Sequence, residues 1–318
     1  MHTAPSRSLS NKNETGILEK GKQMNWLQKF PHMDDDSLRS LKQAIDEGFR
    51  SFTRGYGDSI ESFFSPLQTF LLVCERFMTQ TPWPIIIAII LAIAWAASRS
   101  VKVVLGALVT LLAIGYLDMW DDSMRTISMI FVCTVMSIVM GLPIGILMAR
   151  SERMQRLVNP VLDVMQTMPS FVYLIPVVML LGIGRVPGLI AVVIYAIPPM
   201  IRMTNLGIRL VDRDVLEAAD AFGSSSWQKL TKVQLPLALP TIMAGINQTI
   251  MMALAMVVIA SMIGVQGLGQ PVLKAIANQY FTLGIFNGLA IVGIAIIFDR
   301  VSQAYGHRLQ KHREIVHG

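Results

Sequence analysis

The feature that most limits the fold of this chain is a series of long apolar segments between residues 82 and 303. A helix needs about 20 mostly apolar residues to cross a bilayer. Only 15% of the residues are charged and 53% are hydrophobic, whereas a soluble domain has about 25% charged residues. We therefore predict an all-α polytopic membrane protein with about seven transmembrane helices. The candidate spans are 82–98, 101–117, 126–149, 162–183, 186–202, 240–264 and 284–303.

The first 80 residues are more polar than the rest of the chain. Leu38, Leu41, Ile45 and Phe49 recur at helical spacing, which predicts an amphipathic helix. Such a helix either lies on the membrane surface or packs on the protein itself, and the pattern does not choose between them. The run at 64–78 is apolar but short and carries two charged residues. We therefore expect it at the membrane interface and not across the bilayer.

Lysine and arginine are distributed unevenly between two sets of loops. One set, which includes the C-terminal tail, holds fourteen of them, and the other holds only Arg125, Arg185 and Lys274. Short loops rich in Lys and Arg remain in the cytoplasm. We therefore expect a cytoplasmic C-terminus and, with seven spans, an N-terminal tail on the opposite side; if residues 64–78 also cross the bilayer, the tail is cytoplasmic.

These patterns divide the chain into four parts. Residues 1–80 form a tail with the amphipathic helix, and residues 81–120 form two accessory transmembrane helices. Residues 121–305 form a core of five spans, in which the polar and kinking residues are concentrated. Residues 306–318 form a basic cytoplasmic tail.

Several classes of function lack their sequence signatures here. The chain has no G-x-x-x-x-G-K-[S/T] pattern, which a P-loop ATPase requires. None of its five histidines falls in a predicted span, which argues against a histidine-based metal or protease site in the membrane. Chains of membrane carboxylates, which are typical of proton-driven transporters, are also missing. We therefore expect a chain that is not an enzyme and binds no metal or cofactor itself.

A polar stretch at residues 212–240, between the fifth and sixth spans, is patterned as two short helices. Asp214 is a candidate N-cap, with an acidic residue three positions later, and Gly223 is a candidate helix stop. Serines at 224–226 are placed to cap a second helix. We expect two later prolines to break the chain before the sixth span.

Three interpretations of this stretch are open: a solvated loop, a DNA-binding helix-turn-helix, and a docking element for a cytoplasmic partner. Between Arg202 and Lys232 there are five basic and four acidic residues, a poor basis for binding a phosphate backbone. We therefore expect no nucleic acid partner. The small side chains of Ala218 and Ala219 permit close approach, and Glu217 offers a charge, so the pattern favours docking.

The stretch also resembles the EAA loop of permease subunits in binding-protein-dependent ABC importers, whose pattern is E-A-A-x3-G-x9-I-x-L-P. The matching residues are Glu217, Ala218, Ala219, Gly223, Val233, Leu235 and Pro236. Valine at 233 replaces the usual isoleucine. Residues 161–184 and 233–270 resemble, in particular, the permeases for glycine betaine, proline betaine and choline. The likeness covers roughly residues 100–305.

This resemblance implies a type I importer core in the last five helices. It implies a homodimer in the bacterial inner membrane, two copies of a cytoplasmic ATPase that uses ATP and Mg, and an extracytoplasmic binding protein. The solute would be glycine betaine, choline or a related quaternary ammonium compound. The implied ATPase-coupling residues are Glu217, Ala218, Ala219, Gly223, Leu235 and Pro236. A self-contained secondary transporter and a membrane scaffold for a cytoplasmic protein remain as alternatives.

Polar and aromatic side chains inside the spans are candidates for a solute pathway. Quaternary ammonium groups favour aromatic faces, which singles out two tyrosines. The polar candidates have an alternative role, because membrane helices also use such groups to hydrogen-bond one another. The candidates are Gln166, Ser170, Tyr173, Tyr195, Asn247 and Gln248.

Overall fold

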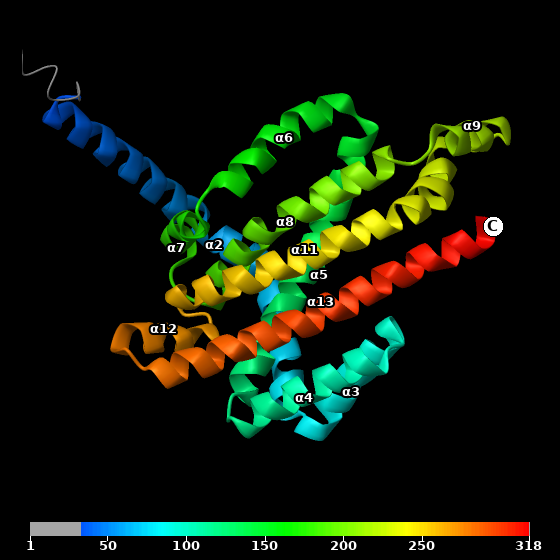
Figure 1. Ribbon diagram of the computed structural model, residues 1–318. Coiled ribbons are helices and arrows are strands. Elements are labelled where there is room, and N and C mark those ends of the chain that lie inside the picture. Colours follow the sequence, from blue (N-terminus) through cyan, green and yellow to red (C-terminus); the bar gives the residue numbers. More distant parts are fainter. Residues whose placement is uncertain (1–32, 318) are drawn as a thin grey trace, which may run out of the picture. The chain divides into compact units, whose positions relative to one another are not determined.

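The computed structural model describes residues 33–317 as helices joined by short turns (Figure 1), with no strand in this part of the chain. Two compact units are separated between Gly55 and Tyr56. The expected placement of the N-terminal tail concerns mainly residues 1–32, which lie outside the described residues.

The helices follow one another along the chain with few intervening residues. They are α2 (Asp35–Gln80), α3 (Trp83–Ser98), α4 (Val101–Tyr116), α5 (Trp120–Arg150), α6 (Glu152–Thr167), η1 (Ser170–Tyr173), α7 (Leu174–Leu181), α8 (Arg185–Arg209), α9 (Arg213–Ala221), α10 (Ser226–Gln228), η2 (Lys229–Gln234), α11 (Leu235–Ala260), η3 (Ser261–Ile263), α12 (Gly269–Asn278) and α13 (Phe281–His317).

Among residues 33–317, four helical segments are long and apolar enough to cross a membrane: α5, α8, the segment Ser226–Ile263 that contains α11, and α13 as far as Gly306. Two bent helix pairs raise the number to six if each pair is one span. The remaining apolar helix, α4, has only 16 residues. The seven predicted spans thus fall on helices, but not all of them are single straight ones.

The predicted span at 162–183 is wrong as a continuous helix. The chain bends by 111° between α6 and the following η1–α7 segment. Met168 is extended, with φ −68° and ψ 133°, because the ring of the following Pro169 disfavours the helical conformation of the residue before it. Broken helices of this kind are tolerated at membrane depth only where protein or a water-filled cavity covers the free backbone groups.

The N-terminal helix is longer than the periodicity predicted. The expected amphipathic helix and the run at 64–78 join into one helix, α2, of 46 residues. In the first unit, Leu38, Leu41 and Ile45 are exposed. In the second unit, Leu71 of the same helix is buried in the main core, so the run at 64–78 packs on protein.

Helix α8 is the centre of the second unit. It makes its most extensive contacts with α5 and α11, and 78% of its membrane-span window is buried, against 17% for α13. Glycines permit the close approach: a Cβ on Gly145 would lie 2.6 Å from the Cβ of Thr204, and one on Gly245 would lie 2.7 Å from the Cβ of Met203. Small residues have this role at helix crossings in membranes.

A cluster of charged side chains ties α2 to this core. The Glu75 carboxylate lies 2.9 Å from the Arg185 guanidinium and 3.6 Å from that of Arg125. Arg185 also donates to the side-chain oxygen of Gln266 at 2.7 Å. Glu75 is 15% exposed and Arg185 is 29% exposed, so the pair is largely removed from solvent.

We expect Glu75→Gln to lower the stability of the folded chain by about 1–3 kcal/mol, because the partly buried Arg185 guanidinium loses its anionic partner, and Arg125 keeps only Asp122, 3.6 Å away. The thermal unfolding midpoint of the detergent-solubilised protein should fall. Asp36→Asn is the matched control, since Asp36 pairs with Arg39 across 3.9 Å where both side chains are more than 75% exposed. Equal midpoints for the two variants would contradict the proposed structural role of Glu75.

Candidate functional site

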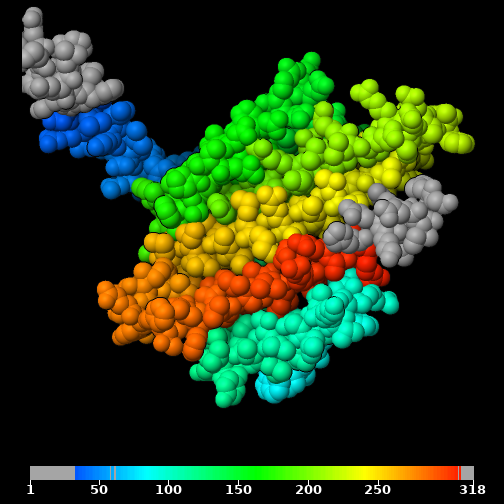
Figure 2. Space-filling view, in the orientation of Figure 1, coloured from blue at the N-terminus to red at the C-terminus, as the bar shows by residue number. Residues whose placement is uncertain are grey.

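The polar stretch at 212–240 forms a helix, a turn and a second helix at one end of the bundle (Figure 1). In the space-filling view this segment protrudes from the surface (Figure 2). Helix α9 begins at Arg213, and its N-cap is Asp212, whose carboxylate accepts a hydrogen bond from the Asp214 backbone N–H at 3.0 Å. The expectation that Asp214 is the cap was therefore wrong by two residues. Both residues are acidic, and the pattern alone did not distinguish them.

Gly223 ends this helix, as predicted. Its φ is +72°, its N–H bonds to the carbonyl of Asp220, and the N–H of Ser224 bonds to the carbonyl of Ala219. These two bonds form a Schellman motif, in which the residue after the C-cap adopts the left-handed conformation that glycine favours. A Cβ at Gly223 would meet no atom within 4 Å. The requirement for glycine within this chain is therefore conformational and not steric.

The second helix is capped as the serines predicted. Ser225 and Gln228 form a reciprocal capping box, which satisfies two free N–H groups at the helix start. The Lys229 ammonium contacts both carboxylate oxygens of Asp220, at 2.5 and 2.6 Å. This ion pair joins the end of α9 to the start of η2 across the Gly223 turn. The sequence alone does not predict this ion pair, because the two residues are nine positions apart and the geometry of the turn between them is not set by the pattern.

The expected break at the prolines does not occur. The chain is helical from Ser226 through η2 into α11, and Leu235 and Pro236 lie at the start of α11. The six residues of η2 form a π-helix. A wider turn of this kind accommodates the missing N–H and the bulky ring of a following proline. The second helix is therefore continuous with the membrane span.

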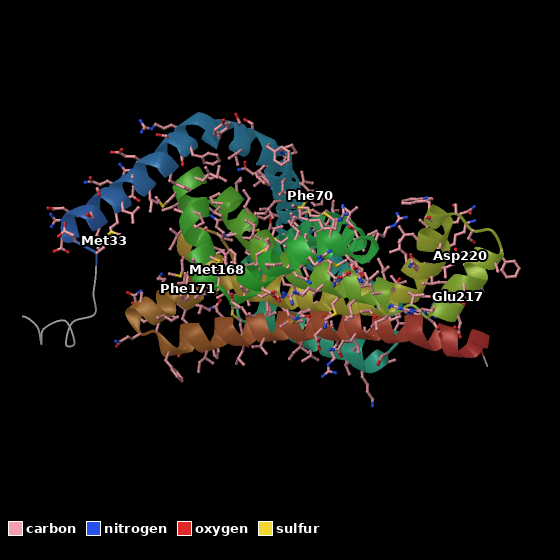
Figure 3. The ribbon with its side chains drawn as sticks, turned by 90° about the horizontal axis from the view of Figure 1, so that it is seen from above. Met33, Phe70, Met168, Phe171, Glu217 and Asp220 are labelled. Carbon is pink, nitrogen blue, oxygen red and sulfur yellow. The ribbon has the colours of Figure 1, made fainter. Side chains whose placement is uncertain are left out.

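The face around the EAA residues is open. None of the residues of α9 is buried, and the apolar side chains of Phe222 and Trp227 are 90% and 67% exposed. Within the described residues, the Glu217 carboxylate has no hydrogen bond or ion pair. Figure 3 shows Glu217 and Asp220 at the end of the bundle, away from Met168 and Phe171 at the break after α6. The site offers a charge, small residues and uncovered apolar groups to another molecule.

The six predicted pathway residues divide into separate groups. The rings of Tyr173 and Tyr195 meet edge to face, with centroids 5.8 Å apart, and the Tyr173 hydroxyl donates to the Met165 carbonyl. Tyr173 is only 6% exposed, so its ring packs within the protein. Gln166 and Ser170 form no hydrogen bond with the other candidates in the described chain, and Gln166 is exposed.

The second group lines a cavity of about 440 Å³ between α11 and α13, which includes Asn247 and Gln248. The Asn247 amide donates to the Asp299 carboxylate at 3.0 Å, and Ser302 donates to the Asn247 oxygen at 2.5 Å. Gln303 donates to the same Asp299 oxygen at 2.6 Å. Three polar residues of α13 thus belong to this cluster and were missed as candidates. A carboxylate near the end of an apolar run was the available signal for Asp299.

The family model for the inner membrane component of binding-protein-dependent transport systems matches residues 141–311. The chain is 48% identical to the glycine betaine/proline betaine transport system permease protein ProW of Escherichia coli K12, over 85% of this chain and 76% of that protein. It is 50% identical to the glycine betaine/carnitine transport permease protein GbuB of Listeria monocytogenes, over 71% of this chain and 81% of that protein.

A further relative is the glycine betaine transport system permease protein OpuAB of Bacillus subtilis, which is 43% identical over 83% of this chain and 93% of that protein. Among solved structures, an inward-facing MetNI methionine ABC transporter aligns with a TM-score of 0.54 at 21% identity, over 60% of this chain and 95% of that one. This likeness confirms the predicted all-α fold with an importer core.

Proposed function

The chain belongs to the family of inner membrane components of binding-protein-dependent transport systems, and from that membership we propose that it moves a quaternary ammonium solute across the bacterial inner membrane. It is the membrane-spanning permease subunit of an ABC importer, and a separate ATPase hydrolyses the ATP. The named relatives transport glycine betaine, proline betaine or carnitine. Glycine betaine, choline or a close analogue is therefore the proposed solute, delivered by an extracytoplasmic binding protein.

The observation that carries the proposal is the open helix–turn–helix at 213–234. Membership of the transporter family implies an ATPase as the partner of this segment, and the geometry of the segment suits the transmission of motion from that ATPase. The Lys229–Asp220 ion pair and the Gly223 turn hold the two helices together, and the second helix continues into α11. Motion of an ATPase surface against α9 would therefore pass to a transmembrane helix as a rigid-body displacement. This end, with the C-terminus, is the one that the Lys and Arg distribution places in the cytoplasm.

The exposure of α6 supports a homodimer with a central pathway. Of its residues only Leu162 is buried, and its surface mixes apolar residues with polar ones such as Gln166. The Asp163–Arg202 ion pair spans 2.5 Å, with side chains 64% and 37% exposed. Such groups are unfavourable against lipid. We propose that α6 faces a second copy of the chain across a hydrated route, and that each copy binds one ATPase.

ATP-dependent uptake tests the proposal. The permease and its ATPase are reconstituted in proteoliposomes with ATP supplied on the ATPase side of the membrane. The binding protein and radiolabelled glycine betaine or choline are added on the opposite side. Uptake should require ATP and all three proteins. Uptake by the permease alone without ATP would instead support a secondary transporter. Tight ATPase binding without solute flux would support a scaffold.

The cavity between α11 and α13 is the proposed cation-attracting part of the route. Asn247 and Gln303 line it, and both donate hydrogen bonds to the carboxylate of Asp299, which is not itself in the lining. We expect Asp299→Asn to raise the solute concentration for half-maximal uptake about fivefold, because hydrogen bonds and contacts to a charged group exceed neutral ones by about 1 kcal/mol. Assembly with the ATPase should be unchanged. The measurement is the concentration dependence of ATP-driven uptake in proteoliposomes.

Thr249→Val is the matched control for this cavity. Thr249 lies two residues after Asn247 on α11 and is fully buried, and its hydroxyl has no hydrogen-bond partner among the residues that the structure describes. The substitution keeps the side-chain shape and should leave uptake unchanged. If Asp299→Asn leaves the concentration dependence of uptake unaltered, the polar side chains between α11 and α13 only hold the two helices together and do not attract the solute.

A further inference from the structure

A second cavity lies on another face of α13, toward α4. It has a volume of about 280 Å³, and its lining includes Lys102 of α4 and Arg300 of α13. These two cations are far apart in the sequence and come together only because α4 packs against α13. They lie at the end of the helices that the Lys and Arg distribution places in the cytoplasm.

Neither cation has a partner within the described chain. No hydrogen bond or ion pair involves the side chain of Lys102 or Arg300, and the lining contains no Asp or Glu. The adjacent Asp299 is occupied by Asn247 and Gln303 on the side of α11. Two positive charges that share one cavity without a counter-charge create a strong local preference for an anion.

The backbone at this end adds to that preference. Helix α4 begins at Val101, and its N-cap Ser100 makes no side-chain capping bond, so the free N–H groups of its first turn and the positive end of its dipole remain available. A further cation, Arg308, donates to the Ala96 carbonyl at 2.6 Å. This bond holds the C-terminal part of α13 against the C-terminal end of α3.

The rest of the cavity is apolar. Val103, Ile296 and Ile297 line it with the small residues Gly106 and Ala107. The two helices approach closely deeper in the membrane, where a Cβ on Gly293 would lie 2.5 Å from the Thr110 methyl group. A ligand for this site therefore needs an anionic head at the level of the two cations and an apolar portion along the helices.

We propose that this cavity binds the phosphate headgroup of an anionic phospholipid from the cytoplasmic leaflet, with an acyl chain along Val103 and Ile296. Basic pockets between transmembrane helices on the cytoplasmic side bind anionic headgroups. The assignment of the leaflet rests on the orientation proposed above, whereas binding itself is independent of transport.

The test compares two lipids with identical dioleoyl chains, phosphatidylglycerol and phosphatidylcholine, titrated against the detergent-solubilised transporter and counted by native mass spectrometry. We expect the wild type to prefer phosphatidylglycerol by about 25-fold, because each Lys or Arg near a headgroup contributes about 1 kcal/mol, or about fivefold. Lys102→Gln/Arg300→Gln should reduce this preference to near one. Lys102→Arg/Arg300→Lys should retain it.

Lys274→Gln is the matched control, because it removes one exposed cation from α12, at the other end of the bundle (Figure 1). It should leave the preference unchanged. Equal binding of the two lipids by the wild type, or a preserved preference in the double Gln variant, would overturn the proposal. Displacement of phosphatidylglycerol by millimolar inorganic phosphate would also overturn it, because the site would then take a free anion.

Discussion

Gly223→Val should reduce ATP-driven solute uptake about 5- to 30-fold while the permease remains inserted in the membrane. Gly223 has a φ of +72°, and a left-handed conformation costs an L-residue about 1–2 kcal/mol, with β-branched residues the least suited. That cost changes the population of the native turn by a factor of about 5–30. The measurement is uptake in proteoliposomes together with the amount of ATPase that co-purifies with the permease.

Gly223→Asn separates the conformation of the turn from the space around it. Asparagine adopts the left-handed conformation more readily than other non-glycine residues, and the structure leaves open space at this Cβ. We therefore expect near-normal uptake in Gly223→Asn. Loss of uptake in both variants would mean that the ATPase contacts Gly223 directly and leaves no room for a side chain. Normal uptake in Gly223→Val would remove this turn from the coupling mechanism.

Local signals predicted the turn because its determinants are local. Gly223 as the stop and the serines as the next cap each satisfy free backbone groups within a few residues, so the sequence alone contained the necessary information. The N-cap was misplaced because Asp212 and Asp214 are chemically equivalent, and only the path of the chain leaving α8 decides which one bonds to the helix. The continuity of η2 with α11 was missed because a proline signals a helix break unless a π-turn accommodates it.

Hydrophobicity located the membrane segments but not their shape. A window of apolar residues at 162–183 reads as one span, yet the Met168–Pro169 step divides it and the two halves diverge by 111°. Similarly, the run at 64–78 was too short to be a span, but the helix that contains it extends to Gln80 and buries Leu71. The break is a local effect of Pro169 that an average over the apolar window hides, whereas the burial of Leu71 depends on neighbours distant in sequence.

The candidate pathway shows the same limit. Asn247 was found because a polar residue inside an apolar run is conspicuous, but its partners on α13 depend on how two helices separated by α12 pack together. Tyr173 and Tyr195 were chosen as aromatic faces for a cation. The two rings pack against each other and Tyr173 is buried. In this conformation these contacts favour a structural role for the ring of Tyr173.

Glu217→Lys should weaken the association of the permease with its ATPase about 100-fold or more, and ATP-driven uptake should fall with it. The Glu217 side chain is exposed and has no partner within the described chain, so we propose that it pairs with a basic residue of the ATPase. Reversing its charge replaces an attraction by a repulsion, which costs several kcal/mol at an interface. Glu217→Gln removes the charge without repulsion and should weaken association about tenfold. The measurement is the dissociation constant of purified ATPase on permease in nanodiscs.

Glu152→Lys is the matched control, because Glu152 is an exposed acid in the first turn of α6, a helix whose start we also place in the cytoplasm. The same change of charge there should leave ATPase affinity within about twofold, since an exposed charge away from a contact contributes little. Equal loss in the two variants would attribute the effect to the overall surface charge. Unchanged affinity in Glu217→Lys would exclude a charge contact at this position, and the open apolar side chains of Phe222 and Trp227 would then be the remaining anchors of the docking site.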